Sequence, residues 1–139
     1  MATCRGYGTA SLVLLLGAIV FGMVLPALAD ARDISVGGVW ITRLDHDVPG
    51  YTSLQRAVEV RRRITDILST PAFRQGVVVT VRQAGRGAVV IVGDVLVFTV
   101  TPEDAAGERM TPVEVAHQWA RLLAEGLNRA IPDADFHTF

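Results

Sequence analysis

The stretch "VVIVGDVLVFTVTPEDAAGE", residues 89–108, decides the fold because it joins a β-hairpin to the start of a helix. Two β-branched runs are separated only by Gly93-Asp94, which predicts a tight hairpin with a primed turn, since glycine accepts positive φ without steric cost. "TPED" at 101–104 then places threonine, proline and an acid at the spacing of a capping box. Both features are explained by structure alone, so we interpret them as structural and not as a ligand site.

The second half of the chain continues this pattern on both sides of the quoted stretch. "VVVTVRQ" at 77–83 predicts a strand, and "AGRG" at 84–87 predicts the turn into the strand at 88–92. A second capping box, "TPVE" at 111–114, opens a long helix that is expected to reach about Ala130. The polar tail after Pro132 is expected to be frayed. The expected buried stripe of the helix is Val115 or Ala116, Trp119, Leu123, Leu127 and Ala130.

The first half of the mature chain predicts one strand and one helix. "ISVGGVWITRL" at 34–44 holds the strand, with Gly37-Gly38 as a bend or turn before it, and Pro49-Gly50 marks a turn in the following loop. Thr52 or Ser53 can cap a helix that runs to about Ser69, before Pro71. Its expected core stripe is Leu54, Ala57, Val60, Ile64, Ile67 and Leu68. Its expected solvent side is Arg56, Glu59, Arg62, Arg63 and Asp66.

The predicted order is strand, helix, three strands and helix. This order favours an α+β fold, a two-layer sandwich in which two amphipathic helices cover one face of a mostly antiparallel sheet of about four strands. The mature chain, residues 30–139, is long enough for a single domain with a modest core.

Residues 1–29 have the pattern of a secretory signal peptide. Arg5 precedes a long uncharged apolar run, Pro26 breaks it, and "ALA" at 27–29 supplies the small residues that a signal peptidase reads. We therefore expect cleavage before Asp30 and a periplasmic or secreted domain without a stable membrane span. The alternative is an uncleaved anchor, because the uncharged run is long enough to span a bilayer.

The composition excludes several classes of function. Cys4 is the only cysteine and lies in the leader, so the mature domain uses no disulfide and no thiolate chemistry. Residues 30–139 carry twelve arginines, no lysine and fourteen acidic residues, a net charge of −2 that does not favour nucleic-acid binding. The basic run Arg61-Arg62-Arg63 is interpreted as a solvated helix face, with a patch for anionic lipid or a partner as the alternative.

No motif in the mature chain predicts a catalytic, cofactor-binding or metal site. Asp45-His46-Asp47 is a tempting cluster, but consecutive residues rarely converge on one ion and no second ligand group stands at a suitable spacing. The glycine-rich segment 85–93 leads into a strand, whereas a phosphate cradle opens a helix. The remaining candidates are interpreted as rim, tail or helix-cap residues: His117, His137, Glu103, Asp104 and Glu108. We therefore expect no enzyme activity.

Four segments together resemble a known family. They are "ITR" at 41–43, "PGYTSLQRAVEVRRRI" at 49–64, "VGDVLVFTVTPEDAAG" at 92–107 and "VAHQWARLLAEGL" at 115–127. In this order they are similar to the periplasmic N-terminal domain of cyanobacterial-type small-conductance mechanosensitive channel proteins. A channel of that class continues into membrane helices and a pore, and no residue here matches a pore. The resemblance therefore implies a stand-alone extracytoplasmic module or a truncated channel gene, and it transfers no catalytic residue.

The function expected from these observations is that of a non-enzymatic module that contacts a channel or another protein of the cell envelope. One alternative is binding of an envelope lipid or small ligand, with the arginine-bearing first helix facing anionic groups. Another is an exported enzyme of unknown type.

Overall fold

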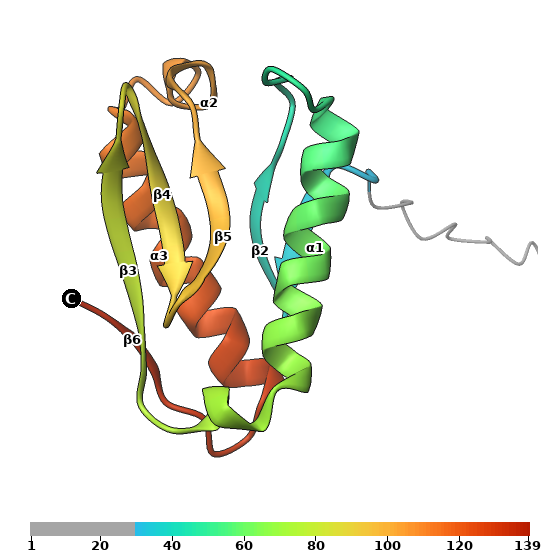
Figure 1. Ribbon diagram of the computed structural model, residues 1–139, viewed down its shortest axis with the longest axis vertical. Helices are drawn as coiled ribbons and strands as arrows, with labels where there is room; N and C mark the ends of the chain where they lie inside the picture. Colours follow the sequence, from blue (N-terminus) through green and yellow to red (C-terminus); the bar gives the residue numbers. More distant parts are fainter. Residues whose placement is uncertain (1–29) are drawn as a thin grey trace, which may run out of the picture.

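The computed structural model describes residues 30–139 (Figure 1). The predicted signal peptide, residues 1–29, lies outside the described residues. The elements in chain order are β1 (Asp33–Val36), β2 (Val39–Arg43), α1 (Ser53–Ser69), the 3-10 turn η1 (Pro71–Arg74), β3 (Val77–Ala84), β4 (Gly87–Val92), β5 (Val95–Val100), α2 (Pro102–Ala106), α3 (Pro112–Ala130) and β6 (Phe136–Thr138). The three predicted caps are present, because Thr52, Thr101 and Thr111 each form a capping box.

A four-stranded sheet in the order β5-β4-β3-β6 forms the centre of the fold. Its strands are antiparallel except for β6, which runs parallel to β3. Helix α3 packs against this sheet, and Trp119 on α3 meets Phe98 on β5 with ring centroids 5.2 Å apart. The α+β class is confirmed, with a finer arrangement in which α3 lies behind the sheet and α1 lies beside the edge strand β5 (Figure 1).

The segment 34–44 forms a hairpin of two strands instead of one strand of the main sheet. β1 and β2 pair only with each other, and the turn between them holds Gly37 at φ +56° and Gly38 at φ +76°. The hairpin packs tightly on α3, where a Cβ at Gly126 would lie 2.5 Å from the carbonyl oxygen of Val36. This close approach explains why a glycine stands inside a long helix, where it weakens helix formation relative to alanine.

The C-terminal segment forms an ordered strand, so the expectation of a frayed tail was wrong. Phe136 is buried and pairs with Val77 on β3. The Asn128 side chain on α3 secures the strand, because its Oδ1 accepts from the Phe136 N–H and its Nδ2 donates to the Phe136 carbonyl, both at 2.8 Å. This strand takes the fourth position of the sheet, which the sequence pattern had assigned to residues 34–44.

Helix α1 has the predicted bounds but not all of the predicted faces. Ala57, Val60, Ile64 and Ile67 are buried as expected, whereas Leu54 is exposed and Arg56 is buried. The stripe on α3 is confirmed except at its last position, since Ala130 is exposed. Within residues 30–139, no helix combines the length and the apolar character needed to cross a membrane.

Candidate functional site: the groove between α1 and β5

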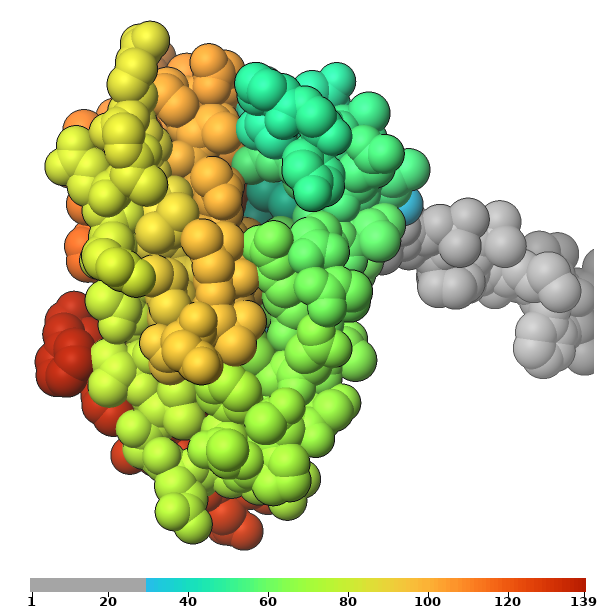
Figure 2. Space-filling model, in the orientation of Figure 1, coloured from blue at the N-terminus to red at the C-terminus, as the bar shows by residue number. Residues whose placement is uncertain are grey.

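A groove of about 380 Å³ lies between helix α1 and the edge strand β5. Figure 2 shows it as a hollow between the orange atoms of β5 and the green atoms of α1. Leu44, Val60 and Phe98 supply a buried apolar floor. The full lining is Leu44, Val48, Pro49, Tyr51, Arg56, Glu59, Val60, Arg63, Val97, Phe98, Thr99 and Thr101.

The base of the groove contains a buried ion pair between Arg56 and Asp104. Only 7% of the Arg56 side chain and 4% of the Asp104 side chain are exposed. The contact is bidentate, with Nη2 to Oδ2 at 2.7 Å and Nη1 to Oδ1 at 3.1 Å. Charge-assisted bidentate pairs of this kind fix the relative position of two elements, here α1 and the first turn of α2.

The Arg56 guanidinium also bonds two backbone carbonyls. Nη1 donates to the carbonyl of His46 at 2.6 Å, and Nη2 donates to the carbonyl of Thr99 at 3.0 Å. One side chain therefore joins α1 to the loop at 44–51, to β5 and to α2. Loss of this side chain would leave several buried polar groups without partners, which is costly in a dry interior.

Asp104 is held as a carboxylate. Burial by itself raises the pKa of Asp104, but hydrogen bonds from the Arg56 guanidinium and from Thr101 outweigh it and lower that pKa below its ordinary value. Oδ2 accepts from the Thr101 N–H at 2.9 Å, and the Thr101 hydroxyl accepts from the Asp104 N–H at 3.1 Å. A carboxylate with its oxygens so engaged acts as a structural anion and is poorly suited to proton transfer.

Two arginines of α1 occupy carbonyls on the edge of β5 that faces the groove. Arg56 takes the carbonyl of Thr99, and Arg63 Nη1 donates to the carbonyl of Val97 at 3.3 Å. An unprotected edge strand presents such groups to another strand. The arginines fill the place of a neighbouring strand, so this edge is protected against strand addition.

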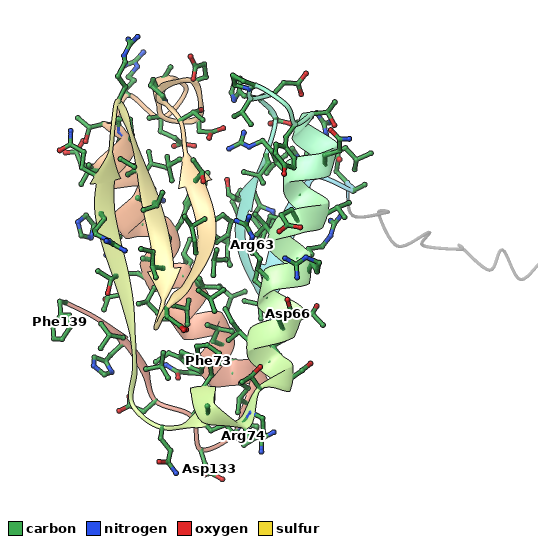
Figure 3. All side chains as sticks on the ribbon, in the orientation of Figure 1. Arg63, Asp66, Phe73, Arg74, Asp133 and Phe139 are labelled. Atoms are coloured by element: carbon green, nitrogen blue, oxygen red, sulfur yellow. The ribbon has the colours of Figure 1, made fainter. Side chains whose placement is uncertain are left out.

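Arg63 lies at the mouth of the groove and is 29% exposed. Figure 3 shows it on the side of α1 that faces β5. Its Nε donates to Glu59 Oε1 at 3.0 Å. Glu59 also accepts from Arg62 at both oxygens, at 2.8 and 3.0 Å, and these bonds together with that from Arg63 lower the pKa of Glu59 to about 2.

The three residues of the Asp45-His46-Asp47 cluster do not converge. Asp45 Oδ1 lies 3.0 Å from Arg32 Nη1, and Asp47 Oδ1 accepts from the Ser53 N–H at 2.6 Å. His46 Nδ1 lies 3.4 Å from Asp104 Oδ1. Across residues 30–139, no group of three or more histidine, cysteine, aspartate or glutamate side chains is placed to hold a metal ion.

The other candidate residues lie apart from one another. Glu103, Glu108 and His117 are exposed, and His137 is partly buried on β6. The hairpin at Gly93 is confirmed, since Gly93 has a φ of +60° between β4 and β5. Of the residues with possible chemistry, the structure brings His46 and Asp104 together and adds Arg56, which the sequence pattern had placed on the solvent side.

Residues 33–130 match a protein family described as a domain of unknown function, DUF8459. The chain belongs to this family. No curated protein and no solved structure matches the chain. The matched segment of this DUF8459 domain includes the whole lining of the groove and both partners of the buried ion pair, and it ends before β6.

The position of Arg56 in the DUF8459 domain had a signal in the sequence. Residues four and eleven positions after Arg56 on α1 are Val60 and Ile67, both buried, so all three share one face of the helix. An arginine on a core face needs an anionic partner, and Asp104 follows a predicted cap. The helical spacing could not identify Asp104 as the partner of Arg56, because the two residues are 48 positions apart along the chain.

Proposed function

We propose that this domain is a non-enzymatic extracytoplasmic module that acts by contact with another protein of the cell envelope. The resemblance to periplasmic domains of mechanosensitive channel proteins suggests a channel as the partner. The observation that carries the proposal is the outer face of α1. There Leu54 and Val58 are 47% and 54% exposed, and Tyr51 just before the helix is 54% exposed.

Leu54 and Val58 are spaced as anchors of a helical binding surface. Leu54 and Val58 stand at positions i and i+4 of α1, a spacing used when a helix inserts one face into a partner, and Tyr51 precedes the helix. The opposite side of α1 already faces the core through Val60 and Ile64. Burial of a second apolar stripe by a partner would remove it from water, which is favourable.

The polar groups of the groove favour a binding role over a catalytic one. Asp104 and Arg56 satisfy each other, and Glu59 accepts from two arginines. A general acid or base needs a side chain that is free to exchange a proton with a substrate.

The contact proposal is tested with a double variant, Leu54→Glu with Val58→Glu, in capture from envelope extract. We expect the wild type to retain a specific envelope protein and the double variant to lose it, because two charges cannot be buried without partners. The control Thr80→Glu with Gln83→Glu places two charges at exposed positions of β3 and should retain the partner. The captured protein is then purified and titrated directly. Equal binding of the double variant would rule out this face of α1.

The extracytoplasmic location is tested at the N-terminus. The leader pattern predicts a mature chain that begins at Asp30, so N-terminal sequencing of the exported protein should start there. Recovery of Met1 would favour the anchored alternative. Recovery of the whole chain in the cytoplasm would contradict the location.

A second candidate function is binding of a lipid or small ligand. It is favoured by the groove, whose volume of about 380 Å³ lies in the range of roughly 300–1,000 Å³ that is usual for small-molecule sites. Its apolar floor and few polar groups are also typical of such sites.

A further inference from the structure

We infer that the groove between α1 and β5 binds a free single-chain amphiphile with a carboxylate head, and that Arg63 holds the head. This inference rests on the second candidate function, that the groove accepts a small ligand. It adds the chemical class of the ligand and the residue that recognises it.

The edge of β5 disfavours an extended peptide as the occupant. A docked strand would need the carbonyls of Val97 and Thr99, and arginines already occupy both of them. Arg56 is fixed by its bidentate contact with Asp104. The occupant therefore gains its binding energy from burial of apolar surface on the groove floor.

The size and floor of the groove suit one alkyl chain. Leu44, Val60 and Phe98 give the groove an apolar floor beside the buried ion pair of Arg56 and Asp104. An apolar cavity of about 150 Å³ holds a six-carbon ring, so a groove of about 380 Å³ accommodates roughly 10 to 15 carbon atoms. A membrane lipid with two long chains exceeds this volume, which favours a free monomer.

Arg63 offers donors for an anionic head at the mouth of the groove. A guanidinium carries five N–H donors. Within residues 30–139, Arg63 uses its Nε for Glu59 and one Nη1 donor for Val97, and its Nη2 donates to no protein acceptor. Three N–H groups therefore remain, and arginine and carboxylate form strong charge-assisted pairs.

Glu59 does not neutralise Arg63 completely. Glu59 accepts from Arg62 at both oxygens and from Arg63 at one, so its single charge is shared between two arginines. The unused Nη donors of Arg63 can bond a ligand carboxylate while Glu59 keeps its contact with Arg62. A carboxylate head is thus favoured at this mouth over a neutral or cationic one.

The test measures binding of decanoate, decanol and decyltrimethylammonium to the purified protein, each below its aggregation concentration. Calorimetry gives affinity, and amide shifts at Val97 and Thr99 report the site. We expect decanoate to bind best, with shifts on β5. Arg63→Gln should weaken decanoate by at least about tenfold, the effect of losing a charge-assisted contact. Arg82→Gln removes an exposed arginine of β3 that does not line the groove, and it should leave the affinity within about twofold.

Each failure has a distinct meaning. Decanol binding as tightly as decanoate, or an unchanged affinity in Arg63→Gln, would overturn the carboxylate assignment and leave ligand binding standing. No response to any of the three probes would overturn both. If wild type and Arg63→Gln both bind phosphatidylglycerol vesicles and neither responds to free decanoate, the protein binds a membrane surface and not a free amphiphile in the groove. This result would overturn the inference. If Arg63→Gln fails to fold, Arg63→Lys keeps the charge without the planar fork and should bind decanoate at intermediate strength.

Discussion

Asp104→Ala should destabilise the domain far more than loss of a helix cap. Asp104 completes the capping box with Thr101, but it is also the buried partner of Arg56. Truncation removes the counterion of Arg56, whose side chain is only 7% exposed in the wild type. Removing one partner of a buried ion pair costs about 3–5 kcal/mol, which is a large fraction of the total stability of a domain of this size.

Glu114→Ala is the matched control. Glu114 occupies the same position of the capping box in α3 that Asp104 occupies in α2, with its Oε2 accepting from the Thr111 N–H at 2.7 Å. It is exposed and has no arginine partner within residues 30–139. Its truncation removes the cap alone, so the difference between the two variants reports the Arg56 contact.

Urea unfolding followed by circular dichroism measures both variants, together with Arg56→Met and the double variant. We expect Asp104→Ala and Arg56→Met each to lower the free energy of unfolding strongly, and the double variant to be less destabilised than their sum. Equal urea midpoints for Asp104→Ala and Glu114→Ala would refute the reasoning, because the ion pair would then contribute nothing beyond the cap.

The same variants make a prediction about pH. The pKa of Asp104 is lowered in the folded state, so as pH falls the unfolded chain takes up the proton first. The stabilisation is complete above the unfolded value of about 4 and is lost as pH falls through the folded value. Wild type should therefore lose more free energy of unfolding than Asp104→Ala between pH 7 and about 2. Parallel pH profiles for the two proteins would contradict this.

Thermal melts check three further predictions on packing and turns. Trp119→Ala should cost about 3–5 kcal/mol, since it empties a large part of the core, and a melting temperature near that of the wild type would contradict its placement. Gly126→Ala should be destabilising because its Cβ would lie 2.5 Å from a backbone oxygen of the β1-β2 hairpin, whereas Gly107→Ala, where a Cβ meets open space, should be almost silent. Gly93→Val should lower the melting temperature, because Gly93 has a φ of +60° that valine resists. Asp94→Asn should leave the melting temperature unchanged. A larger loss in Asp94→Asn than in Gly93→Val would contradict the purely structural role of the turn.

Local chemistry made most of the elements predictable from the sequence. Capping boxes, proline positions and β-branched runs act over a few residues, and they set the bounds of α1, α3 and the strands β3 to β5. The turn at Gly93 was predictable for the same reason. These signals do not depend on what the rest of the chain does.

The errors came where distant contacts decide the structure. Phe136 looked like part of a polar tail, and only the side chain of Asn128 and the free edge of β3 make it a strand. Strand β1 was missed because it is four residues long and pairs only with β2, so Gly37-Gly38 was interpreted as a bend or turn before a single strand. The partner of β6 lies far away along the chain, whereas β1 pairs with the next strand and is too short for its pattern to be recognised.

The arginines of α1 show why the candidate site could not be found from residue type alone. Arg61 donates to the backbone carbonyl of Ala31 at 2.6 Å, Arg62 pairs with acids of its own helix, and Arg63 faces the groove. Consecutive positions on a helix point about 100° apart, so one basic run supplies three different environments. A solvated face was the expected role of all three, and it describes Arg62 best.

The two arginines of the groove have different roles: Arg56 stabilises the fold, and Arg63 is proposed to recognise the ligand. Arg56 has its charge compensated by Asp104, and its Nη donors are taken by Asp104 and two backbone carbonyls, so it mainly shapes the groove. Arg63 shares an acid with Arg62 and keeps unused donors at the groove mouth. Removal of Arg56 should therefore lower stability and ligand affinity together, whereas removal of Arg63 should lower affinity with little change in the melting temperature. A large loss of stability in Arg63→Gln with normal decanoate affinity would reverse this division.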